Sequence, residues 1–418
     1  MKTHNSFDER FVFEGKAKTW SIIAIVIGIV AIAAGFLFGY AERTFSNLLL
    51  MGYYFTCVCA ASALFCAIQY VAQAGWSASM IRIPQAIAKV LPIAGTILII
   101  IIAAGIYFTH DVVVDGKTIA EPYLYSAWAT KGLTVANSAN FDKIVAGKAS
   151  FLNIPFFFIR LIVFLGLYSI IAALLVKYSE NEDEIGGMTN YKKSFNVACV
   201  FLLIFGFSNP VFGFDVMMSL EARWYSTMFG WYNFAALWVS GLSVLTLVII
   251  LLREKGYFSW LTEDHMHNMG LFMFAFSVFW TYVWFAQFLL TYYANLPEEA
   301  VYFYKRWEPE FKPWFWLNIV INFAAPFLAL MARGSKRKTG LLKVVCIILI
   351  CGHWLDYYMM VMPDTVGPDG RGFSFEEIGT FIGFAGLFSY LVQNALSKFK
   401  SLIPKNHPFL EESLHHHI

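Results

Sequence analysis

The stretch W-S-I-I-A-I-V-I-G-I-V-A-I-A-A-G-F-L-F-G-Y, from Trp20 to Tyr40, contains no charged residue. As an α-helix, which rises about 1.5 Å per residue, it is long enough to cross the roughly 30 Å hydrocarbon core of a membrane. It is also longer than the apolar core of a signal peptide, so we expect it to remain in the mature protein. The stretch therefore predicts a transmembrane helix.

The composition of the whole chain agrees with this prediction. Of the 418 residues, 59% are hydrophobic and 14% are charged, whereas soluble domains have about 25% charged residues. The formal charge of +2 and the lack of basic tracts interleaved with aromatic residues predict no nucleic-acid partner. Apolar runs of about twenty residues favour helices over the short alternating strands of a membrane barrel. We predict an all-α integral membrane protein.

Hydropathy and interfacial Trp and Tyr residues place about ten helices along the chain. The expected helices are 20–40, 48–74, 90–108, 151–176, 195–217, 231–252, 270–293, 314–331, 341–362 and 378–395. Both termini then lie on one side, and the connections on that side hold the majority of the 30 lysines and arginines. The positive-inside rule therefore predicts cytoplasmic termini. In the external loop 109–150, V-V-V-D-G-K-T-I predicts a small hairpin around Asp115 and Gly116.

Short motifs recur in the same order in two parts of the chain. P-F-F-F-I-R begins at Pro155 and P-W-F-W-L-N at Pro313, while F-D-V-M-M begins at Phe214 and L-D-Y-Y-M-M at Leu355. We interpret them as an internal duplication that produces two parallel four-helix bundles, helices two to five and six to nine. The expected regions are 1–47 (cytoplasmic N-terminus and flanking first helix), 48–230 (first bundle), 231–362 (second bundle) and 363–418 (flanking last helix and cytoplasmic tail).

Charged side chains inside the expected helices are candidate functional residues, because burying them in a membrane is costly. Arg160 of the fourth helix and Asp215 of the fifth are opposite charges, and we interpret them as a structural ion pair. In the ninth helix, His353, Asp356 and Tyr357 share a face because they are three and four residues apart. His353 and Asp356 are therefore placed to share a proton as a coupled pair.

Uncharged polar residues lie in the same external half of the membrane. They are Asn318 and Asn322 in the eighth helix and Gln287 in the seventh. Together with His353, Asp356 and Tyr357 they form a predicted proton route, in which Tyr357, Asn318 and Asn322 extend a hydrogen-bonded chain outward. Interhelical hydrogen bonding without proton transfer is the alternative interpretation.

The sequence lacks the residues that several kinds of cofactor binding and catalysis require. One histidine in the apolar core cannot supply both axial ligands of a membrane haem, and the spacing of the six cysteines suits neither an iron–sulfur cluster nor structural zinc. No phosphate-binding loop, nucleophile elbow or dinucleotide-binding motif is present. We expect no catalytic residue, haem, iron–sulfur cluster or metal site in this chain, and quinone or lipid stay open as ligands.

Four longer motifs carry a resemblance to a known family. They are M-S-L-E-A-R-W-Y-S-T-M-F-G-W-Y from Met218, T-E-D-H-M-H-N-M-G from Thr262, F-W-T-Y-V-W-F-A-Q-F-L-L-T-Y-Y-A-N-L-P-E-E from Phe279 and H-W-L-D-Y-Y-M-M-V-M-P from His353. The chain resembles the ActF subunits of alternative complex III, the bacterial quinol:cytochrome c oxidoreductase, within the NrfD/PsrC-like membrane subunits. Arg223 stands where that family usually has histidine, so the resemblance implies no titrating role there.

The resemblance implies a subunit of a respiratory quinol-oxidising complex in the bacterial cytoplasmic (inner) membrane, without a redox cofactor of its own. The implied partners are an ActC-like quinol-oxidising subunit, iron–sulfur and haem c subunits, and membrane lipids. The implied roles are scaffolding and proton translocation.

A secondary transporter with a midplane acidic site is the alternative function. Parallel repeats and Asp356 suit a transporter, but transporters of this kind have helices broken at matching positions of both repeats. Asn209-Pro210 in the fifth helix is the one clear sign of a break, and Gly352 is its nearest counterpart.

Overall fold

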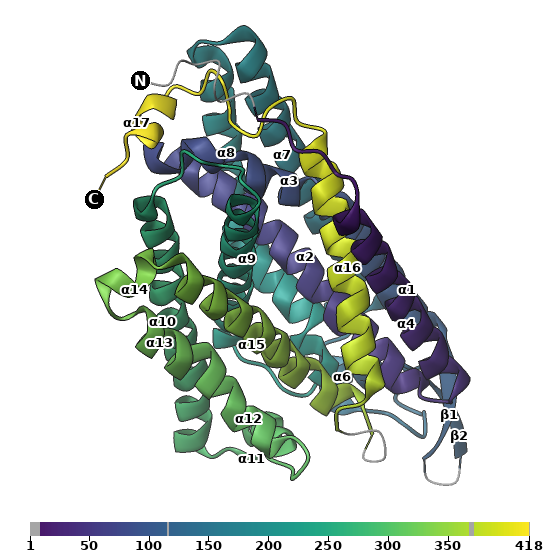
Figure 1. The fold of residues 1–418 in the computed structure, drawn as a ribbon. Coiled ribbons are helices and arrows are strands. Elements are labelled where there is room, and N and C mark those ends of the chain that lie inside the picture. Colours follow the sequence, from purple (N-terminus) through teal and green to yellow (C-terminus); the bar gives the residue numbers. More distant parts are fainter. Residues whose placement is uncertain (1–8, 115–116, 368–371, 418) are drawn as a thin grey trace.

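The computed structural model describes residues 9–114, 117–367 and 372–417. Long helices run side by side through the molecule, and short elements lie at its two ends (Figure 1). Within the described residues, 10 helices are long and apolar enough to span a membrane. This result confirms the predicted all-α membrane fold.

The spanning helices follow one another along the chain, and the longest connection, between α4 and α7, contains the two strands and two short helices. They are α1 (Lys16–Leu37), α2 (Ala41–Val71), α3 with α4 (Arg82–Ala88 and Leu91–Tyr107), α7 (Ile154–Ile185), α8 (Met188–Val216), α9 (Met228–Glu254), α10 (Glu263–Ala294), α12 with α13 (Lys312–Ile319 and Ala325–Leu330), α15 (Thr339–Thr365) and α16 (Phe375–Ser397). The short elements are η2 (Gly75–Met80), α5 (Ser126–Ala129), α6 (Lys143–Gly147), η3 (Met218–Glu221), α11 (Pro297–Arg306), α14 (Arg333–Arg337) and α17 (Leu410–Leu414).

Several helices are longer than the apolar runs that predicted them. α2 begins at Ala41 rather than at residue 48, and α7 continues to Ile185 rather than ending at residue 176. Polar side chains hold these added turns: Arg82 of α3 donates to the Ser179 hydroxyl of α7 over 3.1 Å and also binds the Asp183 carboxylate. Hydropathy detects only the apolar part of a helix and misses polar turns at its ends. In the structure, the first bundle therefore begins near residue 41 and not at the expected residue 48.

The spanning helices form two rings of four. Helices α2, α4, α7 and α8 pack in one ring, and α9, α10, the α12–α13 segment and α15 pack in the second ring in the same chain order. The rings meet where α2 and α8 contact α9 and where α15 contacts α2. Helices α1 and α16 pair with each other outside the rings and rest on α2 (Figure 1). The fold is therefore two four-helix bundles with flanking first and last helices.

Glycines allow α1 and α16 to approach closely. A Cβ atom built on Gly28 of α1 would lie 2.4 Å from the Cα atom of Gly383 in α16. A Cβ atom built on Gly379 would lie 2.3 Å from the Cβ atom of Ala31. Small residues at such a contact let backbones pack tightly in a membrane, where van der Waals contact replaces the hydrophobic effect between helices.

The loop between α4 and α7 contains the predicted hairpin. Strands β1 (Thr109–Val114) and β2 (Lys117–Pro122) pair antiparallel, with Val112 opposite Ile119. Asp115 and Gly116, which the sequence places at its turn, lie outside the described residues. The hairpin lies at the end of the molecule opposite to the two termini (Figure 1).

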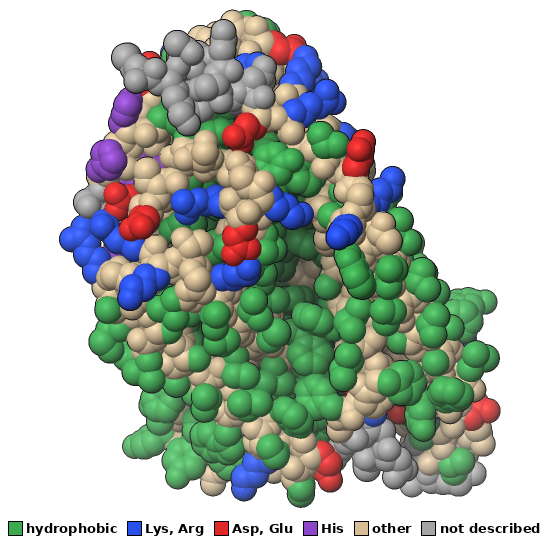
Figure 2. All heavy atoms as spheres, in the orientation of Figure 1, with side chains coloured by type: hydrophobic (Ala, Val, Ile, Leu, Met, Phe, Trp, Pro, Cys, Tyr) green, Lys and Arg blue, Asp and Glu red, His purple; other side chains and the backbone are tan. Residues whose placement is uncertain are grey.

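The two described ends of the chain meet on one side of the molecule. The backbone N–H of Leu402 donates to the carbonyl of Glu9 over 2.8 Å, and the Ser413 hydroxyl donates to the Trp76 carbonyl over 2.7 Å. Charged side chains gather at this end, above a broad belt of hydrophobic side chains (Figure 2). The belt is the surface that a membrane would cover.

Candidate functional site

The carboxylate of Asp356 lies fully buried inside the second bundle, roughly 13 Å from the C-terminal end of α15 by helical rise. Asn318 of α12 donates to Oδ1 over 2.8 Å, and Trp280 of α10 donates to Oδ2 over 2.9 Å. The Tyr232 hydroxyl of α9 also donates to Oδ1. Each helix of the second ring thus contributes one side chain, and none of the three donors carries a charge.

A π-helical turn positions the two asparagines. The sequence predicted one uninterrupted helix over 314–331, but Val320–Ala324 (η4) forms a π-helix between α12 and α13. Asn322 lies in this turn and donates to Asn318 Oδ1 over 2.6 Å and to the Gly352 carbonyl over 2.9 Å. A Cβ atom at Gly352 would lie 2.3 Å from the Asn322 side-chain oxygen, so a glycine is needed there.

His353 and Tyr357 do not join the hydrogen bonds around Asp356. His353 Nδ1 is 3.7 Å from Asp356 Oδ2, which is too long for a hydrogen bond. The imidazole instead packs edge-on against the Trp280 ring, with 5.7 Å between ring centroids. Tyr357 turns toward α2, where its ring contacts those of Tyr53 and Tyr54. The expected outward chain therefore does not run through Tyr357, and Asn322 leads from Asn318 toward Gly352 on the inner side.

A small cavity lies between Asp356 and the C-terminal end of α15. Gln287, Asn318 and Tyr232 line it together with Tyr302 and Arg306 of α11. Gln287 is buried, and its side-chain oxygen makes no hydrogen bond with any described residue. Polar groups facing a small buried space are the usual partners of internal water. The cavity thus brings Gln287 into the same site as Asn318 without direct contact between the two amides.

Beyond the cavity, an ion-pair network reaches the surface of the protein. Arg306 donates to Asp364 over 2.8 Å, while Lys305 lies 3.4 Å from Asp364 and also pairs with Glu221. Burial alone lowers the pKa of Lys305, but Asp364 and Glu221 outweigh it and raise that pKa above its ordinary value. The side chain of Lys305 is 32% exposed. The network therefore links the buried cavity to the surroundings.

The first bundle holds a fully paired aspartate. Arg160 of α7 donates from Nε and Nη2 to the two oxygens of Asp215 in α8, over 2.7 and 2.8 Å. Its guanidinium also donates to the Phe151 carbonyl over 3.1 Å and lies over the rings of Phe151 and Phe156. Both partners are buried. This bidentate geometry compensates both charges inside the protein.

The two aspartates occupy equivalent positions of the repeated motifs. Arg160 and Asn318 both end a P-x-x-x-x-[R/N] motif, and Asp215 and Asp356 both follow the first residue of the second motif. The structure brings each aspartate to the matching residue of its own bundle, over 2.8 Å in both cases. This match supports the internal duplication, and it shows that an amide replaces the guanidinium in the second bundle.

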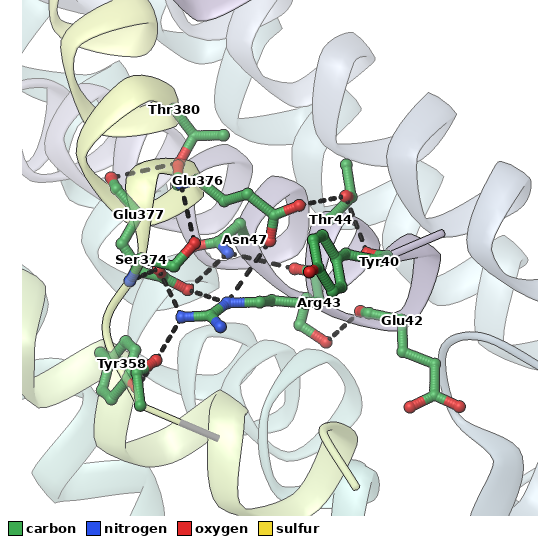
Figure 3. Close-up of polar contacts among 12 residues, drawn as sticks. Tyr40, Glu42, Arg43, Thr44, Asn47, Tyr358, Ser374, Glu376, Glu377 and Thr380 are labelled. Carbon is green, nitrogen blue, oxygen red and sulfur yellow. Dashed lines mark hydrogen bonds and ion pairs between the residues drawn. The ribbon is translucent and has the colours of Figure 1, made fainter. Parts of the chain in front are cut away.

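A further cluster, which sequence reasoning missed, joins the N-terminal ends of α2 and α16 (Figure 3). Arg43 donates from Nε and Nη2 to the carboxylate of Glu377 over 2.8 and 2.7 Å, and Asn47 donates to the same carboxylate over 2.9 Å. Thr44 donates to Glu376 over 3.0 Å. The carboxylates of Glu376 and Glu377 are both buried.

This cluster was missed because the expected helices began too far along the chain. Helices beginning at residues 48 and 378 placed Arg43, Glu376 and Glu377 in loops. A usable signal was the S-F-E-E pattern from Ser374, which the structure shows to be a capping box between Ser374 and Glu377 at the start of α16.

Arg223, where the sequence departs from the family that it resembles, lies at the outer surface. Its side chain is 68% exposed and forms an ion pair with Asp142 over 2.7 Å. Partial burial opposes ionisation of Asp142, but the Val145 N–H and the Arg223 guanidinium outweigh it and lower the pKa of that carboxyl. This pair holds the external loop against the turn after η3.

Comparison with known proteins adds no family to these observations: no family model matches the chain, and no curated protein matches it significantly. Among the residues that the structure describes, no group of three or more His, Cys, Asp or Glu side chains is arranged to hold a metal ion. The site around Asp356 is thus defined by its own geometry, which is a buried carboxylate with neutral donors and a polar path to one surface.

Proposed function

We propose that this chain is a membrane subunit of a bacterial respiratory quinol-oxidising complex of the alternative complex III type, with roles in scaffolding and proton translocation. The observation that carries the proposal is the buried carboxylate of Asp356, held by neutral donors where the first bundle has an Arg160–Asp215 pair. The motifs that resemble ActF subunits contain Tyr232, Trp280 and Asp356 and so run through the helices that build this site.

Proton exchange is the chemistry that this arrangement supports. A carboxylate inside a membrane needs a compensating charge, and a proton can supply it where no fixed cation does. A proton from the outer side would pass Lys305 and Asp364, enter the cavity at Arg306 and Gln287, and reach Asp356 beside Tyr232.

Scaffolding rests on a separate feature, because large apolar side chains such as Phe207 and Tyr293 are exposed on the helices and are available to partner subunits.

The orientation proposed for the complex puts both termini in the cytoplasm. Lysine and arginine gather in the connections on the side of the two chain ends, as the positive-inside rule requires for a cytoplasmic face. The cavity beyond Asp356 then opens to the periplasmic side of the cytoplasmic membrane. The implied partners, an ActC-like subunit and iron–sulfur and haem c subunits, are part of this proposal.

The transporter alternative is less well supported. Helix α8 continues through Asn209-Pro210, and the π-helical turn Val320–Ala324 interrupts the second bundle at a position where α7 of the first bundle is continuous. In the described residues the two repeats therefore lack breaks at matching positions, which the repeats of such transporters share.

Purification of the chain from its native membrane under mild conditions tests complex membership. We expect it to copurify with subunits that contain iron–sulfur clusters and haem c, and the preparation to oxidise quinol with cytochrome c as acceptor. A chain that migrates alone in blue-native electrophoresis and transports a solute after reconstitution would overturn the proposal in favour of the transporter.

A further inference from the structure

A lateral groove runs between the flanking helix α16 and the second bundle. Its deeper part lies among α2, α9, α15 and α16 and is lined by residues such as Tyr54, Phe55 and Phe384. Its wider part, with a cavity volume of about 300 Å³, continues along α9 and α16 toward the side of the termini. The two parts share four lining residues: Val244, Ile350, Ala385 and Phe388. They therefore form one continuous groove, visible as the hollow between hydrophobic side chains in Figure 2.

The length of the groove matches one leaflet of a bilayer. On α9 its lining extends from Lys255 to Val244, a distance of roughly 16 Å by helical rise. One leaflet contributes about half of the roughly 30 Å hydrocarbon core. The groove therefore begins near the expected headgroup level on the side of the termini and ends near the middle of the membrane.

The chemistry of the groove changes along its length. The deep part is apolar, while Ser389 and Gln393 of α16 and Lys255 at the end of α9 line the wider part. Lys255 is exposed and forms no ion pair within the described residues. The neighbouring carboxylate of Glu254 is already paired with Lys343 over 2.7 Å, and that of Glu9 accepts the Phe258 N–H over 3.0 Å. A cation without a counter-charge thus stands at the headgroup end.

We propose that this groove binds an anionic phospholipid of the leaflet on the side of the termini. Its acyl chains lie between α16 and α9, with one chain reaching Tyr54 and Phe384, and its phosphate contacts the Lys255 ammonium. The bound lipid fills the space between the α1–α16 pair and the second bundle and so fixes the flanking pair against the rings. This inference is independent of the quinol-oxidation proposal, because it uses no residue of the Asp356 site.

Native mass spectrometry of the purified protein with phosphatidylglycerol and phosphatidylcholine tests the proposal. The wild-type chain should retain one phosphatidylglycerol in preference to phosphatidylcholine. Lys255→Gln should reduce that preference about fivefold, the effect of roughly one lysine on an anionic headgroup. Ala385→Phe adds a ring to an exposed position in the groove and should weaken retention of both lipids.

Matched variants outside the groove serve as controls. Lys193→Gln on α8 and Ala275→Phe, at an exposed position of α10, lie on helices that do not line the groove and should behave like wild type. Phosphatidylglycerol retention that Ala385→Phe leaves unchanged would overturn the proposal, since the lipid would then bind elsewhere. Displacement of phosphatidylglycerol by an equimolar isoprenoid quinone would also overturn it and would assign the groove to a quinone tail instead.

Discussion

Two aspartates at equivalent positions are stabilised in opposite ways. Asp215 receives both of its strong hydrogen bonds from the Arg160 guanidinium, whereas Asp356 receives its bonds from an amide, an indole and a phenol. A buried carboxylate that has a fixed counter-charge is stabilised in its charged form. A buried carboxyl that lacks a counter-charge can become neutral by binding a proton. At the residue scale, this difference is the basis on which we propose a structural role for the Arg160–Asp215 pair and proton exchange for Asp356.

Arg160→Met tests the structural role of the first pair. The substitution leaves the Asp215 carboxylate buried without its cation, so we expect a loss of about 3–5 kcal/mol in the free energy of unfolding. Thermal unfolding of the purified chain in detergent measures this loss of stability. Removing both charges in Arg160→Met/Asp215→Leu should recover most of the loss. A single variant as stable as wild type would show that the pair contributes nothing.

His407 makes the packing of the C-terminal tail depend on pH. The imidazole is buried beside the rings of Tyr70 and Tyr191, and burial, with Arg82 nearby, lowers its pKa from 6.5 to about 4. Because the folded state has the lower pKa, its stabilising contribution is complete above pH 6.5 and is lost as the pH falls toward 4. The protection factors of the amides of residues 401–410, which correct the exchange rates for their intrinsic slowing at low pH, should fall over that window. In His407→Phe this pH dependence should disappear, and an unaltered profile would exclude His407 as its cause.

At the scale of elements, the flanking helices depend on backbone contact rather than on large side chains. Gly383 of α16 lies against Gly28 of α1, so a Cβ atom there would approach backbone at 2.5 Å. Gly166, in the middle of α7, has open space where its Cβ atom would lie. The same substitution should therefore have opposite effects at these two glycines.

Gly383→Ala should lower the thermal stability of the chain, because α1 and α16 must separate to admit the methyl group. Gly166→Ala should instead raise the free energy of unfolding by about 0.5–1 kcal/mol, because alanine is the better helix former and meets no neighbour. Melting temperatures in the same detergent compare the two variants. Equal shifts of the same sign would contradict the close packing of α1 on α16.

Some elements could be predicted from the sequence and others could not. Hydropathy located every spanning helix, because the cost of burying backbone and charge in lipid leaves few alternatives. The π-helical turn at Asn322 could not be predicted. It depends on contacts between α12, α13 and α15, and a local sequence pattern contains no information on such contacts. The same holds for Tyr357, whose spacing puts it on the face of Asp356 while packing turns it toward Tyr53.

At the scale of the whole molecule, the structure pairs the two bundles differently from the prediction made from the sequence. The sequence predicts His353 and Asp356 as the pair of the second bundle, whereas the structure joins Asp356 to Asn318, which occupies the motif position of Arg160. Tyr232 was missed because an aromatic residue near a helix end usually marks the membrane interface. Trp280 was missed because a tryptophan in the middle of an apolar helix gives no sign that its indole will bind a carboxylate. Arg306 and Asp364 were missed because both fall outside the expected spanning helices, and the sequence does not show that they pair with each other.

The most direct test of proton exchange at Asp356 is quinol turnover and proton stoichiometry of the assembled Asp356→Asn complex over about pH 6 to 8. Asparagine keeps the volume and loses the exchangeable proton, so the complex should assemble while turnover, or protons moved per quinol, falls by about tenfold or more. Asp215→Asn, the matched control, should reduce the amount of assembled complex but not the turnover per assembled complex. Assembled Asp356→Asn complex with unchanged turnover and unchanged proton stoichiometry would contradict the proposed role of Asp356.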